Sequence, residues 1–223
     1  MDNKASGISI STKIAILAAV LSLFIQCEYF NSSTAHAELR NQENVPLRWN
    51  EEGPFGQDKP MPDLSYVSLF KFNIMPFNDQ RKEGQEIGRN ISDQEKGKVY
   101  TITTNDNIPA WARKQFIRLM EEYGLNTGED NKALSIQCTL LKLYVNESDR
   151  FRGNVLFRIE VYDPDKKLIW SGLTNGVSSR WGRTFKLENY YEAISYSFTE
   201  AVLSFLTDKS FQEALGKVAI DKK

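Results

Sequence analysis

Histidine is almost absent from this chain, which has a single one among 223 residues. That residue, His36, lies near the N-terminus, before the segments that show strand or helix patterns. Histidine is the commonest general base and a frequent metal ligand at neutral pH. Ser-His-Asp and Cys-His arrangements are therefore excluded for the folded part. We expect a protein that is not an enzyme and that has no catalytic residues, no metal ion and no cofactor.

Cysteine is nearly as scarce, with only Cys27 and Cys138. Cys138 lies between apolar residues in "LSIQCTLL", which indicates a small core residue. If Cys27 is modified, no second free thiol is left, so an intramolecular disulfide is excluded.

An excess of charge of one sign is also missing. The chain has 28 Lys and Arg against 29 Asp and Glu, for a formal net charge of -1. Nucleic-acid binding depends on a basic surface that neutralises phosphates. The composition therefore gives no reason to expect a nucleic-acid partner.

No apolar run is long enough to cross a membrane. The longest one, residues 14–25 with the sequence "IAILAAVLSLFI", is interrupted only by Ser22. At about 1.5 Å per residue in a helix it cannot span a hydrocarbon core of roughly 30 Å. It follows Lys4 and Lys13, and this order is typical of a secretory signal. Residues 1–26 are therefore predicted to be a signal peptide.

Two processing sites follow the apolar run. The tetrapeptide Phe24-Ile25-Gln26-Cys27 resembles the bacterial lipobox, in which the cysteine is acylated and becomes the new N-terminus. Gln26 and Phe24 depart from the residues usual at these positions. Ala35-His36-Ala37 has instead the small-x-small form of an ordinary signal-peptidase site, which would release a soluble protein. We favour lipidation at Cys27 and keep cleavage after Ala37 as the alternative.

Residues 27–63 are rich in Asn, Gln, Glu, Gly and Pro and show no sustained apolar period. Such a segment cannot bury enough surface to offset its chain entropy. We expect a flexible tether here, followed by one globular domain at 64–217 and a C-terminal tail at 218–223.

The domain pattern predicts an α+β fold: a mixed or mostly antiparallel sheet of about five strands, two main helices packed on one face and a short C-terminal helix. Pro109 near a helix start and Gly124 just past its end mark the first helix. A shift of the apolar face near Leu140 indicates a β-bulge. The predicted strands are 65–75, 98–104, 133–145, 153–163 and 167–181, the predicted helices are within 105–126, 189–208 and 210–218, and 76–97 is predicted to be a long loop.

The order of these elements resembles the YajG-type family of bacterial lipoproteins. The likeness spans about residues 64–216, with Asp79-Gln80-Arg81, Ile87-Gly88, "EEYGL" and "DKSFQEAL" as its local fragments. It implies a lipid-anchored protein of the outer membrane and cell envelope with no established reaction.

Five residues are candidate contacts for a partner. Asp79 and Arg81 follow the first strand, where an ion pair would either shape the loop or bind a ligand. Trp181 lies between arginines and is expected to be exposed, with Arg180 or Arg183 stacked on its ring. Lys222 and Lys223 end the chain as given, and a terminal lysine is what plasminogen kringle modules bind.

Together these features predict a palmitate-bearing outer-membrane lipoprotein that acts as an accessory or interaction module. Its partners would be the membrane, through the lipid anchor, and a protein of the envelope or of a host surface. The alternative is a surface-exposed adhesin that binds host extracellular-matrix or plasma proteins such as plasminogen.

Overall fold

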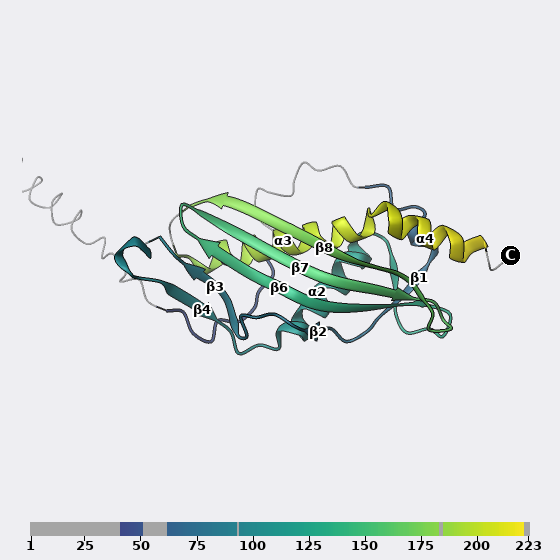
Figure 1. The fold of residues 1–223 in the computed structure, drawn as a ribbon, viewed down its shortest axis with the longest axis horizontal. Coiled ribbons are helices and arrows are strands. Elements are labelled where there is room, and N and C mark those ends of the chain that lie inside the picture. The colour runs from purple at the N-terminus through teal and green to yellow at the C-terminus, as the bar shows by residue number, and fades with distance from the viewer. Residues whose placement is uncertain (1–40, 51–61, 93, 183–184, 221–223) are drawn as a thin grey trace, which may run out of the picture. The chain divides into compact units, whose positions relative to one another are not determined.

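The computed structural model describes residues 41–50, 62–92, 94–182 and 185–220 (Figure 1). The signal peptide, Cys27, the site after Ala37, Lys222 and Lys223 lie outside these residues, so those predictions stay predictions. Within the described part, no helix is both long and apolar enough to pass through a bilayer.

The centre of the fold is a meander of three long antiparallel strands, as predicted. These strands are β6 (Leu134–Glu147), β7 (Arg150–Tyr162) and β8 (Leu168–Trp181). β7 pairs with both neighbours along nearly its whole length. The register of β6 against β7 shifts between Leu140 and Lys142, which confirms the bulge predicted from the apolar pattern.

The free side of β6 pairs with three short parallel strands placed one after another along its length. They are β1 (Lys71–Ile74), β2 (Asn78–Asp79) and β3 (Glu86–Asn90). β4 (Tyr100–Thr103) lies antiparallel to β3, and β5 (Asn126–Thr127) lies parallel to β1. The eight strands form one sheet in which most of the pairing is antiparallel.

The prediction of about five strands is therefore wrong, and so is the long loop at 76–97. The short strands carry too few residues to show alternation, and both residues of β2 are exposed. In β3, Gly88 looks like a loop residue. It is required there because a Cβ would lie 2.8 Å from the carbonyl oxygen of Val145 and 2.9 Å from the ring of Tyr190. The predicted strand at 65–75 is also shorter, since residues Val67–Leu69 form a 3-10 helix.

Three α-helices cover one face of the sheet: α2 (Ile108–Glu122), α3 (Leu187–Leu206) and α4 (Lys209–Ile220). Val155, Phe157 and Ile159 of β7 are fully buried beneath them, whereas alternate residues face the other side. α2 begins as predicted, with the Asn107 side chain accepting the Ala110 N–H at 3.0 Å. α4 is longer than expected and includes positions assigned to a tail from residue 218.

Residues 41–50 pack against the domain, although a flexible tether was predicted for them. The N–H of Gln42 donates to Thr101 at 2.8 Å, and the N–H of Thr103 donates to Gln42 at 2.9 Å. Val45 is buried, and the Trp49 ring lies 5.8 Å from that of Phe198. The folded unit therefore begins before Leu64. Composition averaged over the whole segment hides these few apolar residues, which pack on surface made by distant parts of the chain.

Tyrosines in the packed layers predict weaker folding at alkaline pH. Burial, with a smaller effect of Glu122 and Glu200, raises the pKa of Tyr123 to about 12. Burial also raises the pKa of Tyr190, and Glu147 adds to the shift. As pH rises, these tyrosines lose their hydroxyl protons in the unfolded chain before they do so in the folded one. Their contribution to the free energy of unfolding is therefore fully present below about pH 10 and falls as pH rises above it.

Urea unfolding at pH 8 and at pH 11 measures this loss. The urea concentration at the unfolding midpoint should be lower at pH 11 than at pH 8. In the Tyr123→Phe variant this difference should be smaller. A Tyr123→Phe variant whose midpoint drops as far as that of the wild type would contradict this assignment.

Candidate functional site

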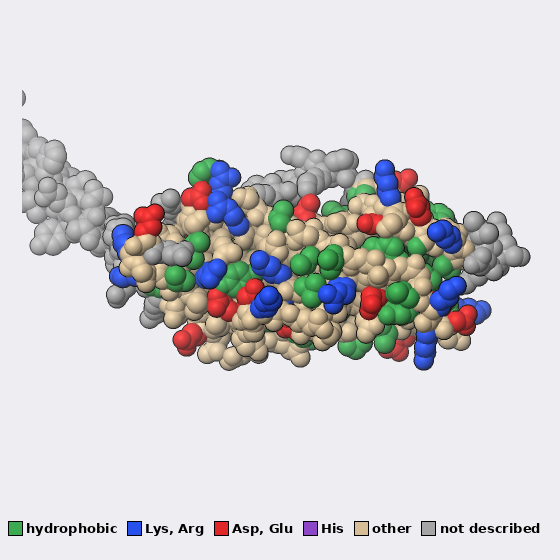
Figure 2. Space-filling view, in the orientation of Figure 1, with side chains coloured by type: hydrophobic (Ala, Val, Ile, Leu, Met, Phe, Trp, Pro, Cys, Tyr) green, Lys and Arg blue, Asp and Glu red, His purple; other side chains and the backbone are tan. Residues whose placement is uncertain are grey.

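The face of the sheet opposite the helices is open and mixes arginines with apolar side chains. We call it the open sheet face; its exposed residues on β7, and on β8 after Trp170, are Arg152, Arg158, Ser171, Leu173, Asn175, Val177, Ser179 and Trp181. Figure 2 shows blue and green side chains along the middle of this face, with few red ones between them. Leu173, Val177 and Trp181 are 64%, 59% and 68% exposed. Apolar side chains of this size are normally buried, so their exposure marks a possible contact surface.

Trp181 is exposed on this face, as predicted, but its cationic partner is Arg150. The Arg150 guanidinium carbon lies 3.7 Å from the ring centroid, because the two residues are directly opposite each other on β7 and β8. Arg180 points to the helix side, where it donates to Asn189 at 3.0 Å and pairs with Glu192. Successive residues of a strand face opposite sides, so the neighbour in sequence is the wrong partner.

Two further tryptophans, Trp111 and Trp170, pack against the aromatic core. Trp170 is buried beside Phe205 and Phe211, and its indole N–H donates to Ser210 at 2.8 Å. Trp111 is half-buried, with its ring 5.8 Å from that of Phe198. Neither side chain is exposed on the open sheet face.

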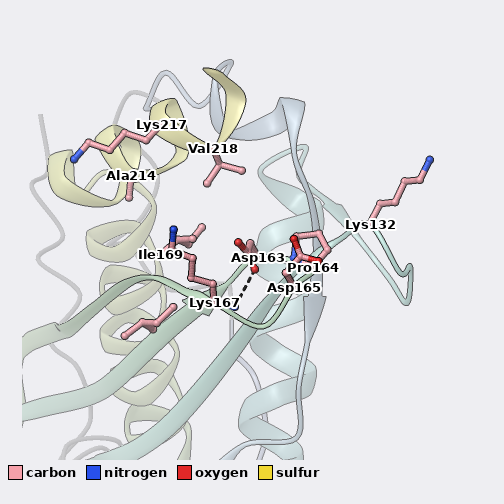
Figure 3. Close-up of a pocket in the computed structure, with 10 residues that line it drawn as sticks. Lys132, Asp163, Pro164, Asp165, Lys167, Ile169, Ala214, Lys217 and Val218 are labelled. Carbon is pink, nitrogen blue, oxygen red and sulfur yellow. Dashed lines mark hydrogen bonds between the residues drawn. The ribbon is translucent and has the colours of Figure 1, made fainter. Parts of the chain in front are cut away.

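A cavity of about 780 Å³ lies between the β7–β8 turn and α4 (Figure 3). Ile169, Ala214 and Val218 supply apolar walls, and the Asp163 carboxylate accepts the Lys167 N–H at 2.9 Å. The amino groups of Lys132 and Lys217 point away from the space in Figure 3. The cavity has room for an apolar group. Its polar side chains do not converge on one point, as they would in a site that binds a polar ligand.

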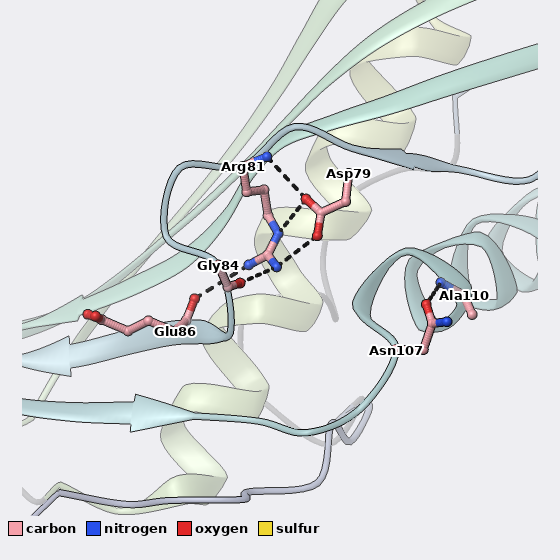
Figure 4. Close-up of polar contacts among 6 residues, drawn as sticks. All are labelled: Asp79, Arg81, Gly84, Glu86, Asn107 and Ala110. Carbon is pink, nitrogen blue, oxygen red and sulfur yellow. Dashed lines mark hydrogen bonds and ion pairs between the residues drawn. The ribbon is translucent and has the colours of Figure 1, made fainter.

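Asp79 and Arg81 form the predicted ion pair, and it shapes the loop that leads into β3 (Figure 4). Arg81 Nε and Nη2 each lie 3.0 Å from an Asp79 oxygen, and Nη2 also donates to the carbonyl of Gly84 at 2.6 Å. The Arg81 side chain is only 1% exposed. Because its donors bind groups of its own loop, the guanidinium is not presented to a partner.

A smaller cavity, of about 410 Å³, separates this loop from the start of α2. Its conspicuous polar groups also have partners: Asp106 accepts the Leu47 N–H at 2.6 Å, and Asn107 caps α2. These hydrogen bonds therefore join the N-terminal segment to the residues at the start of α2.

The one free cysteine in the described part of the chain, Cys138, is buried. Burial raises the pKa of the Cys138 thiol well above its usual value, which agrees with the predicted core position. Among the described residues, no group of three His, Cys, Asp or Glu side chains is arranged to hold a metal ion.

A buried polar cluster around Glu147 was not predicted from the sequence. The carboxyl group of Glu147 is fully buried, where it accepts the Phe185 N–H at 2.9 Å and the Tyr190 hydroxyl at 2.8 Å. The bulge in β6 turns Leu143 and Val145 toward the helices, and the same alternation places Glu147 there. The alternate spacing of Leu143, Val145 and Glu147 was the feature of the sequence that could have predicted this burial. The cluster joins the end of β6 to the first turn of α3, so its role is structural.

No family model matches the chain, and no curated protein matches it. Among the solved structures that are similar to it in fold are two bacterial proteins. A Xanthomonas campestris protein of family DUF330 has a TM-score of 0.44 and 8% identity, covering 69% of this chain and 89% of its own. A minor lipoprotein from Acinetobacter baumannii has a TM-score of 0.35 and 11% identity, covering 66% of this chain and 94% of its own. Likenesses this distant assign neither a family nor a function, and membership of the YajG-type family stays a prediction.

Proposed function

We propose that the protein is a lipid-anchored lipoprotein of the bacterial outer membrane whose folded domain is a non-enzymatic interaction module. The observation that carries the anchor is Cys27, placed one residue after the end of the apolar run at 14–25. A run of that length suits a secretory signal and is too short to span a bilayer. Acyl chains on the cysteine would then supply the attachment, since each buried methylene contributes about 0.8 kcal/mol.

The open sheet face supports the role of the domain. Arginine and aromatic side chains dominate binding energy at protein interfaces, and Trp181 with Arg150 combines the two. Leu173 and Val177 add exposed apolar surface on the same strand. By contrast, the polar groups of the Asp79–Arg81 loop are bound within their own segment.

Cys27→Ala tests the anchor, and its expected effect is a change of phase in a detergent extraction. The wild-type protein should partition into the detergent phase and fractionate with outer membranes, whereas the variant should lose both properties. Cys138→Ala is the matched control: it removes the other thiol, which is buried in the domain, and should leave partitioning unchanged.

Mass spectrometry of the native N-terminus separates the two processing sites. An acylated chain that begins at Cys27 supports the proposal. A chain that begins at Glu38 and stays in the aqueous phase would overturn the anchor and favour a secreted protein.

A further inference from the structure

We propose that β8 is a homodimer interface, at which it pairs antiparallel with β8 of a second copy and continues the sheet across a two-fold axis. This interface uses residues of the folded domain and does not depend on lipidation of Cys27. Its test therefore stands apart from that of the anchor.

β8 is a long strand with one edge open. It has 14 residues and, in the part of the chain that the structure describes, pairs only with β7. Figure 1 shows it as the outermost strand of the sheet. Alternate N–H and C=O groups of such a strand point away from its neighbour and can bind another strand.

Most of β8 lacks the usual protection of an open edge. Natural edge strands carry lysines, prolines or bulges that prevent pairing with another chain. β8, with the sequence "LIWSGLTNGVSSRW", has no lysine and no proline, and Arg180 is its one charged residue. Its register against β7 shifts at the start of the strand, between the pairs Val161–Trp170 and Tyr162–Leu168, and is regular from Trp170 to Trp181.

The apolar residues of β8 select the partner and the register. Paired residues must face the same side of a continuous sheet, so an odd-numbered residue must oppose an odd-numbered one. In the regular part of the strand, from Trp170 to Trp181, two registers of this kind leave only one residue unpaired. The register centred on Asn175 sets Leu173 opposite Val177 of the second copy. The register centred on Gly176 would set Leu173 opposite a serine, Ser179.

Charge does not oppose the favoured register. Arg180 would lie opposite Trp170 of the second copy, and it is already paired with Glu192 of its own chain. No two like charges of β8 then face each other. A strand with this self-complementary pattern fits a second copy of the chain, since a Leu–Val contact forms on each side of the axis.

Cysteine cross-linking of the full-length protein in intact cells tests the register, whether or not the protein is anchored. At Asn175→Cys the two new thiols meet at the axis, where paired Cα atoms lie about 4.5–5.5 Å apart and a disulfide can form. Ser179→Cys is the control on the same strand and face. Its two copies would lie about 27 Å apart along the strands, so it should not cross-link. Equal cross-linking of the two variants, or none in either, would overturn the proposal.

A charge pair provides a second test that does not use thiols. Leu173→Glu is exposed and lies beside Arg158, so the monomer should fold. The variant should weaken dimerisation at least tenfold in analytical ultracentrifugation of the detergent-solubilised full chain. Adding Val177→Lys to the same chain should restore the dimer, because the new carboxylate then faces the new ammonium. A wild-type protein that sediments as a monomer, or a double variant that fails to recover, would contradict this interface.

Discussion

Gly176→Ala is expected to lower the free energy of unfolding by about 3 kcal/mol, the upper end of the usual range for overpacking a core. An ideal Cβ at this position would lie 1.9 Å from the Ser197 carbonyl oxygen and 2.4 Å from the Ala201 nitrogen. Both atoms belong to the backbone of α3, which cannot turn aside as a side chain could. The helix would have to move away from β8, and the contacts beneath it would weaken.

Thermal or urea unfolding measures this effect, and Gly216→Ala is the matched control. Gly216 lies in α4, where the nearest atom to a new Cβ, the Tyr66 hydroxyl, is 3.7 Å away. Alanine is favoured over glycine inside a helix by roughly 1 kcal/mol, so the control should be neutral or stabilising. If Gly176→Ala unfolds at the wild-type midpoint, α3 does not lie as close to β8 as described.

Glu147→Leu is expected to cost about 3 kcal/mol as well. The substitution keeps a side chain of similar size but removes the acceptor of the Phe185 N–H and of the Tyr190 hydroxyl. A buried donor left without a partner costs roughly 1–3 kcal/mol. Phe185 also has a positive φ of 47°, a conformation that its hydrogen bond to Glu147 helps to hold. The segment before α3 should therefore become mobile.

Glu147→Gln separates the loss of hydrogen bonds from the loss of charge. The amide oxygen can still accept the Phe185 N–H, and the amide nitrogen can donate to the Tyr190 hydroxyl. Glu147→Gln should lower the free energy of unfolding by about 1 kcal/mol, clearly less than Glu147→Leu. Equal losses for the two variants in urea unfolding would show that the carboxylate charge, rather than the hydrogen bonds, stabilises this cluster. Hydrogen exchange at Phe185 reports the predicted mobility directly.

The two sets of contacts have the same consequence for the molecule. Gly176 and Glu147 both hold α3 against the sheet, one by allowing close approach and the other by hydrogen bonding. With α3 covering the inner side, Leu173, Val177 and Trp181 remain on the outer side. The exposure of these three side chains therefore depends on which face of the sheet the helices occupy.

Parts of the fold with a long, regular pattern were predictable. The meander, the bulge near Leu140 and the start of α2 at Asn107 each follow from residues close together in the chain. The line of short strands β1, β2 and β3 was not predictable. Each of them is ordered by β6, which comes many residues later, and two to five residues alone carry no reliable alternation.

The candidate site divides in the same way. Exposure of Trp181 followed from its polar surroundings, but its stacking on Arg150 did not, because that contact crosses from β7 to β8. Asp79 and Arg81 were paired correctly. That their pair also binds the rest of the loop became visible only with the Gly84 carbonyl and the burial of the guanidinium.

Local patterns in the chain were thus enough to predict an α+β domain and, as predictions, a secretory leader and a lipidated Cys27. They were enough because periodicity, capping and short motifs act between residues that are neighbours in sequence. The number of strands, the packing of residues 41–50, the burial of Glu147 and the open edge of β8 depended on the tertiary structure. These features arise between segments far apart in the chain, and only the folded arrangement decides which backbone groups and side chains remain unpaired.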